Sequence, residues 1–355
     1  MIDKNQFRGH EQLSFFHDKE SGLKAFIAVH DTSLGPAAGG CRMWNYENEM
    51  EALNDALRLS RGMSYKNAMA GLPLGGGKAV IMANPKTDKT DALFKAFGRS
   101  IDSLNGAYIT AEDVGVTTED MQIVSTETKH VAGLSEGDHA SGDPSPFTAR
   151  GIYNGIKACV KYKLGKDSLQ GLTVAVQGVG HVGQYLCEHL HNDGVKLLVS
   201  DIVQENLDLA VEKFGATIVA PDEILNVKAD VFSPCALGAI LNKDSIQNLN
   251  VPIVAGGANN QLADDRDGLY MMERDILFAP DYVINAGGII NVCGETTGNY
   301  DIDWVNEKVD KIYNTLMHIF ERSDAESRPT NKVADEMAEE IIANAAKSKK
   351  TRAAA

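Results

Sequence analysis

The sequence predicts an α/β fold of two domains, the second built on a mainly parallel sheet with helices on both faces. Its 355 residues exceed what one hydrophobic core usually serves. Strand and helix candidates alternate from Leu172 onward, which is typical of parallel strands joined by crossover helices. A glycine fingerprint directly follows the first of these strands, at 178–183. We therefore expect an N-terminal α/β domain over 1–145 and a Rossmann-type domain over 146–330.

The first domain is expected to mix short strands with longer helices. Alternation of apolar and polar residues favours strands, and apolar residues three and four positions apart favour helices. The strands expected are 13–18, 22–30 and 108–110, and the helices expected are 47–70 and 91–104. The longer helix leads directly into the glycine-rich run GLPLGGGKAVIMANP, 71–85.

The second domain is expected to begin where two prolines in DPSPFTARG, 143–151, interrupt the pattern before a helix at 146–162. The strands expected after it are 172–176, 196–200, 217–220, 231–233, 253–255 and 283–285, and the helices are 207–214, 304–321 and 334–347. Because nothing like a strand follows, we expect the C-terminal helix, about 331–350, to pack back on the first domain.

The glycine fingerprint predicts a dinucleotide site. Gly178 permits a tight turn, Gly180 lets the backbone approach a pyrophosphate, and Gly183 lets helix and strand pack closely. Asp201 closes the next strand, where a carboxylate binds the adenosine ribose and repels a 2′-phosphate, so NAD is the expected cofactor. The glycines alone would also suit a simple strand-to-helix turn, but the flanking strands and the acid favour the cofactor. The remaining cofactor-binding residues expected in the loop are Val179, His181 and Val182.

Composition excludes several classes of protein. With 43% hydrophobic and 23% charged residues and no apolar run near the roughly 20 residues of a bilayer span, the sequence is that of a globular protein. The formal net charge of −15 disfavours nucleic acid and anionic membrane as partners. The first residues lack the apolar segment of a signal peptide, and the five cysteines form no CxxC pair. We therefore expect a reduced, cytoplasmic protein.

Two features invite an interpretation that the sequence does not favour. His189 and His191 lie two positions apart, so on a helix they point in different directions, and no set of further ligands accompanies them. No metal site is expected. Cys293 follows the segment NAGGIINV, 285–292, but we expect a buried, inert thiol there because no base accompanies it.

Three ionisable residues of the first domain lie among small or apolar neighbours: Lys66, Lys78 and Asp113. A lysine that enters an apolar, glycine-lined cleft loses hydration, which lowers its pKa toward that of a useful general base; Lys78 is the better candidate. A phosphate-binding P-loop is excluded by spacing: that motif requires the lysine directly after its second glycine and a hydroxyl residue next, whereas here Gly77 intervenes and Ala79 follows. Taken alone, Lys66 is better explained as a surface lysine at a helix end.

Six runs along the chain are specific enough to indicate a family. They are LGPAAGGCRMW (34–44), ALRLSRGMSYKNAMAGLPLGGGKAVI (56–81), ITAEDVG (109–115), VQGVGHVG (176–183), NNQL (259–262) and APDYVINAGGIINV (279–292). Together, in this order, they resemble the amino-acid dehydrogenases of the glutamate, leucine, phenylalanine and valine group, and the leucine-acting members most of all. The resemblance covers nearly the whole chain. It implies hydride transfer from the Cα of an L-amino acid to NAD, in a catalytic cleft between the two domains.

The same resemblance implies a role for each site residue. Lys78 activates water, and Asp113 exchanges protons with the amino nitrogen, so that an imine is hydrolysed to a 2-oxo acid and ammonia. Binding of the substrate α-carboxylate is implied for Lys66, Asn260 and the backbone around Gly39 and Gly40. Contact with the nicotinamide is implied for Thr148 and for Asn285, the latter at the end of its expected strand.

The substrate side chain is expected to meet an apolar wall. The residues that match it are Ala38, Ala111, Ile289 and Val292. This favours branched-chain amino acids, leucine first, although differences of one methylene discriminate weakly, by about 1–3 kcal/mol. A phenylalanine dehydrogenase of the same group is the alternative, and a non-catalytic NAD-binding regulator is disfavoured because Lys66, Lys78 and Asp113 are all present. The resemblance also implies a homo-oligomer, an octamer or another dimer-based assembly.

Overall fold

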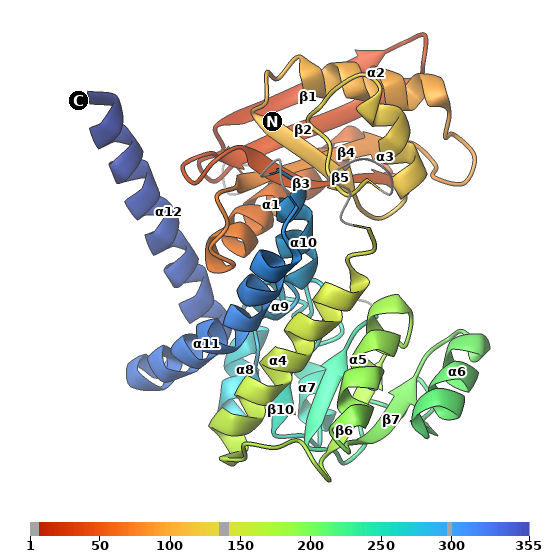
Figure 1. Cartoon of the computed structure of the whole chain (residues 1–355), viewed down its shortest axis with the longest axis vertical. Helices are drawn as coiled ribbons and strands as arrows, with labels where there is room; N and C mark the ends of the chain where they lie inside the picture. Colours follow the sequence, from red (N-terminus) through yellow and green to blue (C-terminus); the bar gives the residue numbers. More distant parts are fainter. Residues whose placement is uncertain (1–6, 135–141, 237, 297–299, 355) are drawn as a thin grey trace. The chain divides into compact units, whose positions relative to one another are not determined.

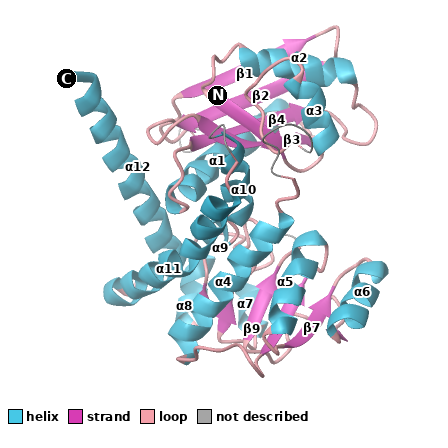
Figure 2. Cartoon of the chain, in the orientation of Figure 1, coloured by secondary structure: helices cyan, strands magenta, loops and turns pink. Residues whose placement is uncertain are grey.

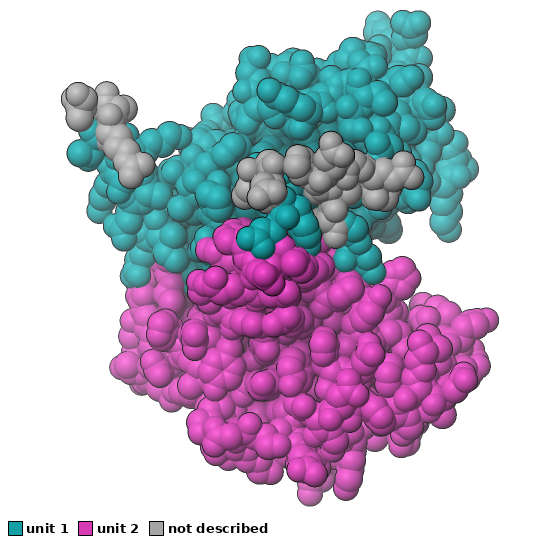
Figure 3. Space-filling view, viewed as in Figure 1, with its two compact units in different colours: residues 1–143, 292–301, 338–355 teal, residues 144–291, 302–337 magenta. Residues whose placement is uncertain are grey.

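The computed structural model describes residues 7–134, 142–236, 238–296 and 300–354 of the chain. Its contacts divide the chain into two compact units (Figure 3). Unit 1 comprises Met1–Asp143, Val292–Asp301 and Ala338–Ala355, and unit 2 comprises Pro144–Asn291 and Ile302–Met337. Helices α10 (Gly287–Thr296) and α12 (Thr330–Ala354) therefore each contribute residues to both units.

Unit 1 contains a mixed sheet of five strands in the order β1-β2-β4-β3-β5 (Figures 1 and 2). The strands are β1 (Gln12–Asp18), β2 (Leu23–Asp31), β3 (Ala37–Trp44), β4 (Gly75–Met82) and β5 (Tyr108–Glu112). β1, β2 and β4 pair antiparallel, whereas β3 pairs parallel with both β4 and β5. The C-terminal ends of β3, β4 and β5 consequently point the same way, which gathers the residues at these ends.

Helices cover both faces of this sheet. Helix α1 (Glu49–Met69) packs on one face, where its small apolar residues meet β2 and β4. Helices α2 (Asp91–Asp102) and α3 (Thr118–Ser125) lie on the other face, over a larger apolar cluster. The side chains of Asn48, Thr90 and Thr117 cap the N-termini of these three helices, so each helix begins where the sequence supplies a cap.

Alternation along the strands decides which site residues share a face. On β4, Ala79 and Ile81 belong to the cluster under α2 and α3, whereas Val80 belongs to the cluster under α1. Lys78, two positions before Val80, therefore lies on the α1 face of the sheet. By the same period of two, the α1 face also receives Ala38, Gly40 and Arg42 of β3 and Ala111 of β5.

Unit 2 contains six parallel strands in the order β11-β10-β9-β6-β7-β8. They are β6 (Thr173–Gln177), β7 (Lys196–Ser200), β8 (Thr217–Ile218), β9 (Val231–Pro234), β10 (Ile253–Val254) and β11 (Leu277–Phe278). Counted from β6, this is the strand order 3-2-1-4-5-6 of the Rossmann fold, in which ligands bind where the order reverses, beside the first strand.

The helices of unit 2 connect these strands and complete the chain. They are α4 (Ser145–Leu164), α5 (His181–Asn192), α6 (Gln204–Phe214), α7 (Lys243–Asn248), α8 (Asp267–Glu273), α9 (Asp281–Ile284) and α11 (Ile302–Glu326), with the first part of α10 and of α12. Among the residues that the structure describes, no helix is both long and apolar enough to cross a bilayer.

The predicted fold class is confirmed, with one wrong element and several missing ones. Residues 283–285, expected as a strand, belong to the short helix α9 and the residue that follows it. The apolar run there is too short for its periodicity to separate strand from helix, and Pro280 stands at the N-cap. Strands β3, β4 and β11 and helices α3, α7, α8 and α10 were not predicted, since glycines or short lengths obscure their periods.

Candidate active site

Lys78 is buried in the middle of a glycine-lined strand. Only 5% of the Lys78 residue surface is accessible to solvent. Three glycines precede it, and a Cβ on Gly76 would lie 2.1 Å from the Ser64 Oγ and 2.2 Å from the Ser64 nitrogen of α1. The glycine run thus lets α1 approach β4 closely and is a packing surface within the protein, which agrees with the exclusion of a P-loop.

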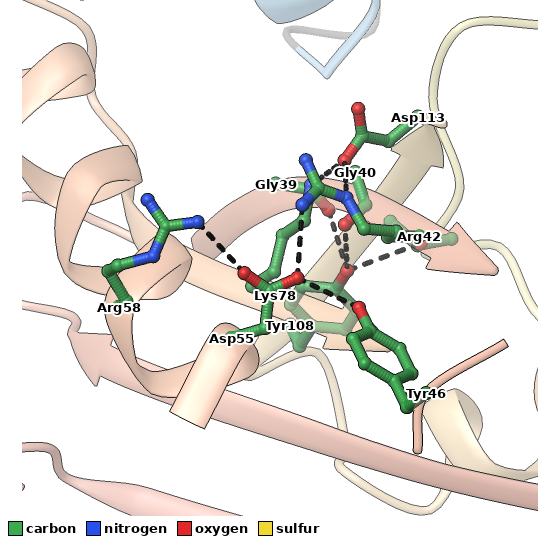
Figure 4. Close-up of polar contacts among 10 residues, drawn as sticks. Gly39, Gly40, Arg42, Tyr46, Asp55, Arg58, Lys78, Tyr108 and Asp113 are labelled. Atoms are coloured by element: carbon green, nitrogen blue, oxygen red, sulfur yellow. Dashed lines mark hydrogen bonds and ion pairs between the residues drawn. The ribbon is translucent and has the colours of Figure 1, made fainter. Parts of the chain in front are cut away.

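Asp113 follows β5 and forms an ion pair with Lys78, through its Oδ2 (Figure 4). The same oxygen lies 3.4 Å from Nε of Arg42. Burial on its own raises the pKa of the Asp113 carboxyl, but the charges of Lys78 and Arg42 and the hydrogen bonds from Lys78 and the Val114 backbone more than offset it. The pKa of Asp113 therefore lies below its usual value, and the group is a carboxylate near neutral pH.

Gly39 and Gly40 lie in β3, between β4, which contains Lys78, and β5, which Asp113 follows. A Cβ on Gly39 would lie 1.9 Å from the Gly77 carbonyl oxygen, and one on Gly40 would lie 2.8 Å from the Asp113 Cβ. The hydroxyl of Tyr108 donates to the Gly39 carbonyl at 2.6 Å, which holds the β3 backbone at this position (Figure 4). Only glycine lets the three strands and the carboxylate come this close.

Lys66 lies in the last turn of α1 and is half-buried. The next residue, Asn67, donates from its side chain to the Gly75 carbonyl at 2.6 Å, which fixes this end of the helix to β4. Unit 1 thus brings together Lys78 and Asp113 in direct contact and supports Lys66 on the helix that covers the same face of the sheet. Ala38 is buried on that face, and Ala111 is half-buried.

Arg42 is the functional candidate that sequence reasoning missed. It also bonds to Asp55 on α1, whose carboxylate accepts hydrogen bonds from Tyr46 and Arg58 (Figure 4). The signal that could have found it is the period of two along CRMW, which puts the arginine on the same face as Gly40. That signal required β3 to be recognised as a strand.

In unit 2 the three fingerprint glycines have different surroundings. Gly178 adopts φ +92°, and a Cβ there would lie 2.8 Å from the Ala236 nitrogen. A Cβ on Gly183 would lie 2.2 Å from the Gly178 carbonyl oxygen, so this glycine permits close packing of helix and strand. A Cβ on Gly180 would meet nothing within 4 Å. Gly180 is also the N-cap of α5, where no side chain caps the helix, so this terminus fits a pyrophosphate.

Asp201 lies directly after β7, beside the glycine loop. Its Oδ2 accepts the Val179 N–H at 2.8 Å, and its Oδ1 accepts the Val203 N–H at 2.9 Å. A carboxylate has further acceptor sites, so these two bonds orient it and leave capacity for ribose hydroxyls. The neighbouring Ile202 is 92% exposed. This arrangement fits the adenosine end of NAD, and the dehydrogenase domain is consistent with NAD binding.

The residues predicted to meet the nicotinamide lie in two nearby segments of unit 2. Asn285, the residue after α9, donates to the Gly257 carbonyl and to the Asn259 side chain, while its own Oδ1 is buried without a hydrogen-bond partner among the described residues. Such an orphaned acceptor fits an amide donor on a ligand. Thr148 Oγ1 lies 2.8 Å from the position of a Cβ on Gly288, at the start of α10.

The remaining predicted substrate residues are divided between the two units. Asn260 lies in unit 2, exposed after β10, with a positive φ of 52°. Ile289 and Val292 are half-buried on α10, the first in unit 2 and the second in unit 1. Cys293 on the same helix is buried and forms no disulfide, which confirms that part of the expectation.

No metal cluster is found within the described ranges of the chain, where no three His, Cys, Asp or Glu side chains converge. The two histidines of α5 make unrelated contacts: His189 stacks on Tyr153, and His191 packs against Phe214.

Comparisons with known proteins give one family. A family model described as the Glu/Leu/Phe/Val dehydrogenase dimerisation domain matches residues 10–130, and the Glutamate/Leucine/Phenylalanine/Valine dehydrogenase model matches residues 199–350. Leucine dehydrogenase from Thermoactinomyces intermedius is 55% identical over 342 residues, which cover 96% of this chain and 93% of the relative.

A relative named for a different substrate is almost as similar. L-tryptophan dehydrogenase from Nostoc punctiforme is 50% identical over 348 residues, 98% of this chain and 97% of the relative. The crystal structure of L-tryptophan dehydrogenase from Nostoc punctiforme superposes with a TM-score of 0.83 at 48% identity, covering 95% of this chain and 97% of that one. Overall similarity therefore identifies the reaction class more firmly than the substrate.

Proposed function

Because this chain belongs to the Glu/Leu/Phe/Val dehydrogenase family and is an amino-acid dehydrogenase, we propose that it catalyses the reversible, NAD-dependent oxidative deamination of branched-chain L-amino acids, leucine first. The products are the 2-oxo acids and ammonia. The observation that carries the proposal is the buried ion pair of Lys78 with Asp113, on the sheet face that α1 covers with Lys66 at its end. Two cations and a carboxylate in one small region suit a substrate with both a carboxylate and an amine.

Each of these residues has a distinct task in the proposed reaction. Lys66 binds the substrate α-carboxylate by charge. Asp113, an ionised carboxylate, accepts a proton from the substrate ammonium and later returns it to the departing amine. Lys78 takes the proton from the water that attacks the imine carbon; it does so as the neutral amine, so the proton that it shares with Asp113 in the resting ion pair must first have left it. When bound, NAD accepts the hydride from the substrate Cα.

Support for NAD over NADP comes from Asp201. The carboxylate is oriented by two backbone hydrogen bonds beside the uncapped N-terminus of α5, and a 2′-phosphate at the ribose would meet its negative charge. Gly178, Gly180 and Gly183 would support the pyrophosphate, with Val179, His181 and Val182 lining the same turn. Asn285 and Thr148 would meet the nicotinamide.

The choice of an aliphatic substrate rests on Ala38 and Ala111. Both are small and apolar and lie on the sheet face of Lys78, and neither offers a cation to a side-chain carboxylate, which disfavours glutamate. Val292 and Ile289 add aliphatic surface on α10. An aromatic amino acid is the second candidate, because Ala38 leaves room for a larger side chain and an L-tryptophan dehydrogenase is 50% identical.

A homo-oligomer is part of the proposal. The family model over residues 10–130 is described as a dimerisation domain, and β1 at the edge of its sheet has one side unpaired among the described strands. Light scattering coupled to size exclusion would give the number of subunits, and a monomer would contradict this part.

The decisive assay follows the absorbance of NADH during oxidation of leucine, isoleucine, valine, phenylalanine, tryptophan and glutamate, each with NAD and with NADP. Highest kcat/KM for leucine with NAD is the expected result. A preference for phenylalanine or tryptophan would favour the second candidate. NAD binding without turnover of any amino acid would refute the proposed activity. Equal use of NADP would refute the proposed role of Asp201 in selecting NAD.

A further inference from the structure

Arg42 lies between two carboxylates of unit 1. Its Nη1 donates to Asp55 Oδ2 at 3.0 Å, and its Nε lies 3.4 Å from Asp113 Oδ2 (Figure 4). The arginine comes from β3, whereas its partners come from α1 and from the end of β5. Its side chain is only 22% exposed, so the guanidinium is largely withdrawn from water and depends on these partners.

Asp55 is a firmly held anchor for this arginine. The Tyr46 hydroxyl donates to its Oδ2 at 2.8 Å, and Arg58 donates to its Oδ1 at 2.9 Å. Burial alone raises the pKa of the Asp55 carboxyl, but Arg42 and the hydrogen bonds from Tyr46 and Arg58 more than offset this, so its pKa lies below the usual value. Because Asp55 is ionised, its bond to Arg42 is charge-assisted and restrains the guanidinium.

Asp113 meets both of its cations on the same oxygen. Lys78 and Arg42 share Oδ2, and Figure 4 shows the other carboxylate oxygen directed away from both. Lys78 hydrogen-bonds this oxygen, Arg42 Nε forms an ion pair with it at 3.4 Å without a hydrogen bond, and the Val114 backbone also donates to the carboxylate, so its rotation about the last bond is defined. Its second oxygen therefore has a defined place, on the side away from the two cations.

We propose that Arg42 is a positioning residue for proton transfer: anchored on Asp55, it orients the Asp113 carboxylate beside Lys78 so that the second oxygen faces the substrate nitrogen. The inference rests on the proposed function, in which Asp113 exchanges protons with that nitrogen. Arginine suits the task because its rigid, planar fork donates in several directions at once, whereas a lysine ammonium on a flexible stem is a point charge.

A merely structural ion pair makes a different prediction. If Arg42 only stabilised unit 1, its loss would lower the melting temperature and leave kcat and its pH profile unchanged in the folded enzyme. If Arg42 positions Asp113, kcat falls while the Kd for NAD, which is bound by unit 2, stays the same. Three substitutions along the same chain of contacts separate these cases.

The variants are Arg42→Gln, Asp55→Asn and Arg58→Gln. We expect Arg42→Gln to lower kcat by about 10- to 100-fold, because a small misplacement of a reacting group has effects of this size. Asp55→Asn, which loosens the anchor, is expected to have a smaller effect of the same kind. Arg58→Gln is the outermost member of this series: its residue contacts the anchor, is 49% exposed and does not touch Asp113, so kcat should fall less than in Asp55→Asn.

The pH profile adds a readout that a structural role would not move. The charged and titratable groups around Asp113 are Lys78, Arg42, Cys41, Tyr46, Tyr108 and the more distant Asp55. Removal of the Arg42 charge is expected to raise the acid limb of kcat/KM by about one pH unit. Arg42→Lys, which keeps a charge, is expected to retain the original limb with a lowered kcat, and guanidinium ion at low concentration is expected to rescue Arg42→Ala.

Two results would overturn the inference. One is an Arg42→Gln enzyme with normal kcat and acid limb; the other is an equal loss of kcat in Arg42→Gln and Arg58→Gln that follows their melting temperatures. Asp113→Asn, measured in parallel, keeps the two proposals distinct. Normal turnover in Asp113→Asn would refute the acid–base role itself, whereas an inactive Asp113→Asn beside a normal Arg42→Gln would refute only the positioning by Arg42.

Discussion

Glycines gather in two regions of the molecule, β3 and β4 of unit 1 and the loop before α5 of unit 2, and they are needed there for different reasons. In unit 1, a Cβ on Gly39, Gly75 or Gly76 would lie within about 2 Å of backbone or side-chain atoms of the protein. In unit 2, a Cβ on Gly180 would meet no atom within 4 Å. The crowded glycines of unit 1 therefore let the chain pack on itself around the lysine, whereas Gly180, open and at the uncapped N-terminus of α5, leaves room for a ligand.

The largest expected effect concerns the residue that the crowded glycines surround. Lys78→Ala is expected to lower kcat by about 10³-fold, within the range of general acid–base catalysis, because the proposed base is lost. The Kd for NAD is expected to stay unchanged, since the residues proposed to bind the cofactor belong to unit 2. Steady-state kinetics and a fluorescence titration with NAD measure the two quantities.

Lys89 offers a matched control for this substitution. It also forms an ion pair with a largely buried carboxylate, that of Asp120, but between elements on the other side of the unit 1 sheet. Lys89→Ala is expected to lower the melting temperature without lowering kcat. Near-normal turnover in Lys78→Ala would show that this lysine is not the base. It would also weaken the proposal that unit 1 supplies the acid–base residues and unit 2 binds the cofactor.

The next effect is on stability. Gly76→Ala would place a methyl group against Ser64 and the Ser60 carbonyl of α1, with no flexible side chain able to give way. We expect a loss of about 3 kcal/mol or more in the free energy of unfolding of unit 1, at the upper end of overpacking. Gly62→Ala on the same helix is the control: its Cβ meets nothing within 4 Å, and alanine suits a helix better. Comparable losses in both variants would show that the crowding is not the cause.

The stability of the α1 contact is also expected to depend on pH. His30 Nδ1 lies 2.8 Å from the Ser64 Oγ, and burial, with a smaller contribution from the neighbouring His10, lowers the pKa of His30 to about 4. The folded state then binds a proton less readily than the unfolded one, whose pKa is 6.5. The contribution of neutral His30 to the free energy of unfolding is fully present above pH 6.5 and declines as the pH falls toward about 4. Below that pH it levels off, with a total loss of at most about 3 kcal/mol.

The chain offers a local probe for this decline. Its two tryptophans lie in different units, Trp44 in unit 1 and Trp304 in unit 2. In a Trp304→Phe background, urea titrations followed by fluorescence report unit 1 alone. His30→Asn is expected to flatten the dependence between pH 6.5 and 4. If the stability of unit 1 kept the same pH dependence in His30→Asn, that dependence would come from groups other than His30.

The same contrast between regions explains what the sequence could predict. The proposed cofactor site of unit 2 depends on a local motif: Gly178 and Asp201 directly follow two successive strands, β6 and β7, so their spacing is enough to place them together. The ion pairs of Arg42 with Asp55 and with Asp113 depend on β3, α1 and the end of β5, which meet only in the folded protein. Local periodicity contains no signal for such contacts, and the glycine pair in β3 hides even the strand that carries the arginine.

The secondary-structure errors have the same origin. The strand expected at 283–285 is a helical turn, because an apolar run of that length fits either period and only the surrounding chain decides. Lys78 was nevertheless recognised as a candidate from its glycine-rich neighbours. The sequence did not reveal that Asp113 is its direct partner, since their pairing depends on the parallel register of β3 with β4 and β5.

The smallest expected effect tests the open glycine. Gly180 has φ −69°, which an alanine adopts without strain, and free space around its Cβ position, so Gly180→Ala is expected to change the free energy of unfolding by less than about 0.5 kcal/mol. The added methyl group would lie where the pyrophosphate approaches the N-terminus of α5, and we expect the Kd for NAD to rise about tenfold. Gly183→Ala, whose Cβ would lie 2.2 Å from the Gly178 carbonyl oxygen, is instead expected to destabilise unit 2. Calorimetric titration with NAD and thermal unfolding separate the two variants. If Gly180→Ala bound NAD normally, the open space at this turn would not be where the phosphates lie.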